Sequence, residues 1–303
     1  MQNYFRAYNE YRLFCLHAGF SALPVTETNL IFFCTHLSQR IAHNSIKCQL
    51  SGISYHCSML GYQFDTTNMV RLHYLLRGIK KCCTSSQSRR TRLPITIMHL
   101  QTILRFLQRA PLSENDKKLW WSASTLAFFG LLRVSEYTST WVRRYQPNIT
   151  LAKSNISFNF NNTIMTVSIK VSKTDVFRAG CRIHIGSTNN MLCPVNAMRL
   201  YLASRTIEVG PLYYFSDNSF LTRGRMASFL TQCLRNINLN THSFRIGGAT
   251  ALAASGVPAA TIRVVGRWSS DCYIRYLRFT PPMLSQLSSC MCSAPTSYDP
   301  FLP

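Results

Sequence analysis

The sequence is 303 residues long and 47% of its residues are hydrophobic, which is enough for one large domain or two ordinary domains with real cores. Thirty-three Lys and Arg residues against eleven Asp and Glu residues give a net charge of +22, and 25 of the basic residues are Arg, whose planar group binds phosphate through two hydrogen bonds. We therefore expect a nucleic acid as the partner and no membrane. Eleven scattered carboxylates also argue against a two-metal nuclease site.

The twelve cysteines show no CxxC pair, so the sequence predicts no metal site, and we expect them to be reduced thiols in the core. No signal segment opens the chain. The longest apolar stretch, residues 119–132, is too short to cross a bilayer. These features indicate an intracellular, reducing compartment, either cytoplasm or nucleus.

The first part of the chain, residues 1–84, carries apolar residues at spacings of three and four and is predicted to form a bundle of about four helices. Thr26 is the expected N-cap of the second helix. Residues 85–94 are polar and basic and are predicted to be a linker. Its arginines are expected either to be solvated or to lie along a DNA backbone; they are Arg89, Arg90 and Arg92.

The second part of the chain has a different spacing of apolar residues. It begins with helical periodicity, continues with alternating residues typical of a small sheet, and returns to helical periodicity, while residues 291–303 are expected to be a loose tail. The predicted fold class is mainly α with a small β-sheet. The expected helices span 98–109, 115–130, 194–205, 224–237, 243–255, 259–265 and 270–278, and the expected strands span 156–160, 164–171 and 182–185.

Three stretches of this second part combine basic or phenolic side chains with glycine: GLLRVSE, HSFRIGG and GRWSSDCYIRY. In the second stretch, His242 and Arg245 are three residues apart at the start of a helix and therefore share one face. Gly247 and Gly248 would allow another group to approach that turn closely. A phosphate there would meet an imidazole, a guanidinium group and helix N-terminal amides together.

These motifs, in this order, resemble the catalytic set of the tyrosine recombinase superfamily, which is also called phage-integrase-like. The GRWSSDxYxRY form resembles the eukaryotic branch of DIRS-like and Crypton-like mobile elements. The resemblance implies a helical, SAM-like core-binding domain over residues 1–84 that binds DNA. It further implies a mixed α+β catalytic domain over residues 95–290.

The resemblance also implies a role for each matching residue. Arg133 and Arg245 would stabilise negative charge on the scissile phosphate. His242 would take part in proton transfer, and Trp268 would stand where many relatives have a second His. Glu136, three residues after Arg133, would orient its neighbours without reacting.

Two assignments have a rival within the sequence. Tyr276 matches the nucleophile of the family, but it lies eight residues after the Trp, where nine is commoner in bacterial and phage relatives, and Tyr273 is an alternative. Lys173 matches the lysine that protonates the leaving 5′-oxygen, because it precedes a turn from which a flexible amine could reach a substrate. Lys170, expected to lie within the preceding strand, is its alternative.

Together these residues predict a site-specific recombinase or integrase that cleaves and rejoins DNA through a 3′-phosphotyrosyl intermediate without metal, ATP or another cofactor. The family implies a homo-tetramer on two DNA duplexes, integration or excision of a mobile element, and a nuclear location. The alternatives are a type IB topoisomerase-like enzyme and a domesticated DNA-binding protein without catalysis.

Overall fold

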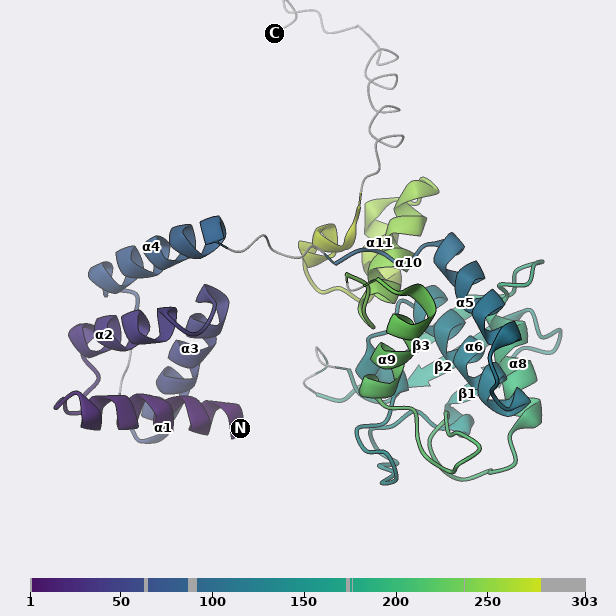
Figure 1. The fold of residues 1–303 in the computed structure, drawn as a ribbon, viewed down its shortest axis with the longest axis horizontal. Coiled ribbons are helices and arrows are strands. Elements are labelled where there is room, and N and C mark those ends of the chain that lie inside the picture. The colour runs from purple at the N-terminus through teal and green to yellow at the C-terminus, as the bar shows by residue number, and fades with distance from the viewer. Residues whose placement is uncertain are drawn as a thin grey trace, which may run out of the picture. The chain divides into compact units, whose positions relative to one another are not determined.

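The computed structural model describes residues 2–62, 65–86, 92–172, 175, 177–236 and 238–278. The chain divides into two compact units, Met1–Arg90 and Thr91–Pro303, and each is described separately below (Figure 1). Among the described residues no helix is both long enough and apolar enough to cross a membrane.

The described residues of the first unit form four helices, as the apolar spacing predicts, with α1 packed on α3 and α2 packed on α4 (Figure 1). Thr26 caps α2, because its hydroxyl accepts a hydrogen bond from the backbone nitrogen of Asn29 at 3.2 Å. Gly52 permits close packing of α1 on α3, since a Cβ there would lie 2.6 Å from that of Ala7. The helices span Gln2–His17 (α1), Glu27–Ser38 (α2), His43–Met59 (α3) and Val70–Ser86 (α4).

Helix α6 lies at the centre of the second unit. It is buried along most of its length and packs against α5, α8 and α10. The three strands form one antiparallel sheet in the order β1-β2-β3, with Ile156 opposite Val167 and Thr166 opposite His184. The helices of this unit are α5 (Ile97–Arg109), α6 (Glu114–Phe129), α7 (Val134–Tyr137), η1 (Lys153–Asn155), α8 (Pro194–Ser204), α9 (Arg223–Leu234), α10 (Ser243–Ala254), α11 (Ala259–Val265) and η2 (Asp271–Tyr276), and the strands are β1 (Ile156–Phe158), β2 (Ile164–Ile169) and β3 (Cys181–Gly186).

Helix α10 lies in the interior because two glycines let it approach other backbone segments. A Cβ on Gly247 would lie 1.9 Å from the carbonyl oxygen of Ile95, and one on Gly248 would lie 2.5 Å from that of Phe128. The sequence predicted that another group could approach this glycine pair closely. In the structure the space is filled by the protein's own backbone, so the pair fixes the position of α10.

Three local expectations are wrong. The segment predicted as a helix over 270–278 is the 3-10 helix η2, and Lys170 lies outside β2, which ends at Ile169. The cysteines are not all core thiols, since Cys48, Cys82 and Cys272 are exposed.

Candidate active site

One buried carboxylate connects two arginines at the start of α7. Arg133 precedes this helix, and its backbone nitrogen donates to Oε2 of Glu136 at 2.9 Å while its Nη1 donates to Oε1 at 3.0 Å. Nη2 of Arg267 donates to the same Oε2 at 2.8 Å. The carboxylate has no solvent exposure, so it is neutralised by these two guanidinium groups and not by water. Glu136 therefore holds the side chains of Arg133 and Arg267 close together.

Arg245 is completely buried within α10. Its Nη1 donates to the carbonyl of Leu131 and its Nη2 to the carbonyl of Gly266, while its Nε has no partner among the described residues. Burial, followed by the positive charges of Arg133 and Arg267, lowers the pKa of Arg245 to about 10, so it remains charged at neutral pH. Both terminal nitrogens of Arg245 therefore donate to backbone carbonyls of the protein itself.

His242 lies at the N-cap position of α10 and is partly buried. Its backbone nitrogen donates to the side-chain oxygen of Asn240 at 2.9 Å, which fixes the turn before the helix. Burial lowers the pKa of His242 to about 4, assisted by the positive charges of Arg92, Arg245 and other arginines. The imidazole is therefore neutral at pH 7. Its ring centroid is 5.1 Å from that of Tyr276.

Tyr273 and Tyr276 lie on the same side of η2, because a 3-10 helix has three residues per turn. Their ring centroids are 6.1 Å and 5.2 Å from that of Trp268. The side of the helix therefore does not separate the two candidates, but burial does. Tyr273 is buried in a cluster with Leu131 and Trp268, whereas Tyr276 is partly exposed and also contacts His242.

Trp268 is buried, and its indole lies over the guanidinium group of Arg245, at 4.3 Å from the ring centroid to Cζ. Gly266 is required beside it, since a Cβ there would overlap the ring at 1.6 Å. The indole nitrogen has no partner among the described atoms. The structure therefore places Trp268 in the cluster as a platform for Arg245.

Of the remaining predicted site residues, Lys173, Arg89 and Arg90 lie outside the described residues. Arg92 is exposed, and it contributes to the lowered pKa of His242, which places it near the cluster. Lys170, the alternative to Lys173, donates from Nζ to the carbonyl of Pro147 at 2.8 Å.

The cluster carries an excess of positive charge. It contains the guanidinium groups of Arg133, Arg245 and Arg267, and Glu136 is the one described carboxylate that is hydrogen-bonded to any of them. Buried charge that is left uncompensated is costly, so this arrangement favours an anionic ligand. No group of three or more His, Cys, Asp or Glu side chains within the described parts of the chain could hold a metal ion.

Sequence reasoning missed Arg267. It belongs to the stretch GRWSSDCYIRY, in which Trp268, Tyr273 and Tyr276 were selected but this arginine was not. Its backbone has a φ of 57°, in the left-handed region that favours glycine, and this conformation turns it toward Glu136. Nothing in the local sequence signals that conformation.

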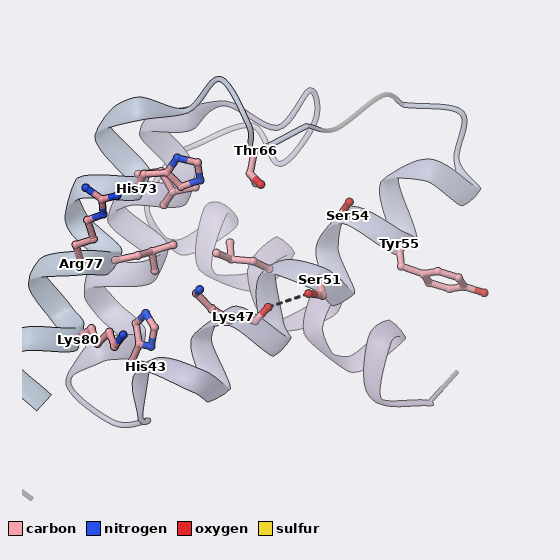
Figure 2. Close-up of a pocket in the computed structure, with 12 residues that line it drawn as sticks. His43, Lys47, Ser51, Ser54, Tyr55, Thr66, His73, Arg77 and Lys80 are labelled. Atoms are coloured by element: carbon pink, nitrogen blue, oxygen red, sulfur yellow. Dashed lines mark hydrogen bonds between the residues drawn. The ribbon is translucent and has the colours of Figure 1, made fainter. Parts of the chain in front are cut away.

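The first unit has a basic groove of about 810 Å³ between α3 and α4. Figure 2 shows the side chains that line it, including the basic residues Lys47, Arg77 and Lys80 and the imidazoles of His43 and His73. Its described lining contains no Asp or Glu. We refer to this surface as the α3–α4 groove, and its charge suits an anionic ligand.

No protein-family model and no curated protein matches the sequence. Structural comparison finds the Tn1549 transposon integrase bound to circular intermediate DNA, with a TM-score of 0.61 and 12% identity over 94% of this chain and 99% of that chain. It also finds the XerH site-specific recombinase bound to a palindromic difH substrate, with a TM-score of 0.60 and 13% identity over 88% of this chain and 73% of that one.

A lambda integrase dimer bound to a COC′ core site is similar as well, with a TM-score of 0.56 and 14% identity over 91% of this chain and 87% of that chain. These neighbours confirm the predicted fold class, in which a mainly helical chain carries a small three-stranded sheet. The chain therefore has the fold of the tyrosine recombinases.

Proposed function

We propose that the protein is a site-specific recombinase that cleaves and rejoins DNA strands. The observation that carries this proposal is the cluster of three guanidinium groups and one carboxylate, which lies beside a partly exposed tyrosine and a neutral histidine. A phosphodiester supplies the anion that the cluster lacks. Phosphoryl transfer requires positive charge around phosphorus, and guanidinium groups provide it without a metal ion.

In the proposed reaction the phenolic oxygen of Tyr276 attacks the scissile phosphorus. A phosphorus–oxygen bond to tyrosine forms as the bond to the 5′-oxygen breaks, giving a 3′-phosphotyrosyl link and a free 5′-hydroxyl. The phenol loses one proton, for which the neutral imidazole of His242 is the acceptor nearby, and the 5′-oxygen gains one, for which Lys173 is the proposed donor. Attack by a 5′-hydroxyl from another strand reverses the step and joins the strands.

The two predicted arginines would act differently. Arg133 is the more accessible, with 17% of its side chain exposed, and Nη1 is its one side-chain nitrogen with a hydrogen bond among the described residues. It is therefore the arginine that would contact a phosphate oxygen directly. Arg245 would supply charge from the interior while its terminal nitrogens bond to carbonyls.

DNA contact would extend over both units, as the predicted division into a core-binding and a catalytic domain requires. In the first unit we assign the α3–α4 groove to the phosphate backbone, because it is lined by cations and by no described carboxylate. Arg89, Arg90 and Arg92 would continue this contact between the units. Support also comes from the structural neighbours, which are complexes with DNA.

We further propose that strand exchange takes place in a homo-tetramer on two duplexes, in the nucleus, during integration or excision of a mobile element. We also assign the protein to the DIRS-like and Crypton-like branch, because its sequence contains the motif GRWSSDxYxRY. A topoisomerase-like enzyme would use the same chemistry on one duplex. A domesticated DNA-binding protein would bind without cleaving.

The proposal is tested by incubating the full chain with nicked duplex DNA of randomised sequence in excess chelator. A nick lets the short cleaved fragment leave, so a covalent protein–DNA adduct accumulates and survives denaturation. We expect this adduct, and joining of strands from two duplexes when a second duplex with a free 5′-hydroxyl is added. Relaxation of supercoiled DNA without joining would identify the topoisomerase alternative, and binding without any adduct would refute the enzyme.

A further inference from the structure

Arg267 connects the two arginines that the sequence places in the site. Through Glu136 it shares a carboxylate with Arg133, and through the carbonyl of Leu131, at 3.4 Å from its Nη2, it shares an acceptor with Arg245. Its Nη1 also reaches the carbonyl of Gly130 at 3.4 Å. No other described residue bonds to both the carboxylate of the Arg133 pair and the carbonyl of the Arg245 pair.

The backbone is shaped around these contacts. Arg267 and Leu131 both have left-handed conformations, with φ of 57° and 45°, which non-glycine residues rarely adopt. Leu131 lies in the turn that follows α6. The backbone carbonyls of this turn accept hydrogen bonds from the guanidinium groups of Arg245 and Arg267. Only 16% of the Arg267 side chain is exposed, so its charge is held inside the protein.

The geometry around Glu136 indicates what Arg267 does. Oε2 is occupied by the backbone nitrogen of Arg133 and by Arg267, which leaves only Oε1 for the guanidinium group of Arg133. Without Arg267, Oε2 could accept a second guanidinium hydrogen bond, and Arg133 and Glu136 would form a bidentate pair. Such a pair would withdraw a donor of Arg133 from the phosphate.

We propose that Arg267 is a positioning residue: it holds Glu136 so that Arg133 donates only one hydrogen bond to the carboxylate and keeps its other donors for the scissile phosphate. This inference rests on the proposed recombinase function. It differs from a direct role of Arg267 on the phosphate, because both of its terminal nitrogens bond to protein oxygens.

The test compares four variants in single-turnover cleavage of nicked duplex DNA: Arg267→Gln, Arg267→Lys, Glu136→Gln and the double variant Arg267→Gln with Glu136→Gln. The matched control is Arg263→Gln, which removes an arginine from an exposed ion pair with Asp271 at 3.4 Å. DNA affinity and thermal unfolding are measured for each protein.

We expect Arg267→Gln to slow cleavage by about 10²-fold, the loss that follows a misplacement of about 1 Å, while DNA affinity remains within about threefold of wild type. The cleavage rate of Arg267→Lys should fall between those of wild type and Arg267→Gln. An ammonium group can pair with Glu136 but cannot also reach the two backbone carbonyls. Arg263→Gln should cleave at the wild-type rate. Since Arg267 acts through Glu136, the double variant should be no slower than the slower single variant.

Wild-type cleavage by both Arg267 variants would overturn the positioning role, and so would strictly multiplicative losses in the double variant. If Arg267→Gln fails to fold, Arg267→Lys decides: a wild-type rate in that folded protein refutes the proposal, and a selective loss of rate supports it. Absence of an adduct with wild type would instead overturn the proposed function, and the positioning role with it.

Discussion

Glu136 is the carboxylate that forms ion pairs with both Arg133 and Arg267, so replacing it by Gln should strongly destabilise the second unit. The substitution preserves volume but removes ion pairs of 3.0 Å and 2.8 Å to Arg133 and Arg267. Removing one partner of a buried ion pair costs about 3–5 kcal/mol. For a unit of this size that corresponds to a decrease in Tm of roughly 10 °C.

The measurement is urea unfolding followed by tryptophan fluorescence, which reports on the second unit because all four tryptophans belong to it. The matched control is Glu114→Gln, which removes the same type of charge from an i,i+3 pair with Lys117 at 2.8 Å on the surface. Exposed pairs contribute about 0–1 kcal/mol, so the control should unfold almost as wild type does. If Glu136→Gln also remains within about 1 kcal/mol of wild type, the carboxylate does not compensate the arginines and the charge argument fails.

Three further outcomes follow from the packing, the pKa of the histidine and the basic groove. Gly247→Ala should lower the free energy of unfolding by about 1–3 kcal/mol, because its Cβ would lie 1.9 Å from a backbone oxygen. Gly78→Ala in α4 should raise it slightly, because the space around Gly78 is open. Thermal unfolding followed by circular dichroism tests both variants. Since the pKa of His242 is about 4 in the folded protein and about 6.5 unfolded, its contribution to stability is complete above pH 6.5 and is lost as pH falls toward 4. Wild type should therefore lose about 2 kcal/mol more than His242→Asn between about pH 7 and pH 4.5 in urea titrations, and equal losses would contradict the burial of the imidazole. Lys47→Gln should reduce the slope of log K for DNA against log salt by about 0.9, while Lys153→Gln, which lies outside the groove, should leave the slope unchanged.

The elements of this fold could be predicted where local patterns determine them. Apolar spacing located the helices of the first unit, Thr26 marked the start of α2, and alternation located the sheet. The 3-10 geometry of η2 could not be predicted, because the helical spacing of its apolar residues resembles that of an α-helix and the choice is made by tertiary contacts. One such contact is the bond from the hydroxyl of Thr250 to the carbonyl of Tyr276 at 3.1 Å.

The sequence could predict which residue types come together in the candidate site, but not how they are bonded to one another. The order of the motifs selected Arg133, His242, Arg245 and Tyr276, and the structure brings them into one cluster. The complete burial of Arg245 could not be predicted from the sequence, since a charged residue in a helix is expected at the surface unless its tertiary partners are known. Arg267 was missed because its position depends on a left-handed backbone conformation and on a carboxylate far away in the sequence, and neither is signalled locally.

The central claim is that Tyr276 attacks DNA, and identification of the residue in the covalent adduct tests it most directly. Wild type, Tyr276→Phe and Tyr273→Phe are incubated with the nicked duplex pool, the adduct is digested with protease, and the DNA-linked peptide is identified by mass spectrometry. Tyr276→Phe removes one hydroxyl and no charge, so it should bind DNA as wild type does and form no adduct, whereas Tyr273→Phe should form the adduct at Tyr276. An adduct that persists in Tyr276→Phe, or that is lost in Tyr273→Phe while DNA binding is intact, would contradict the assignment.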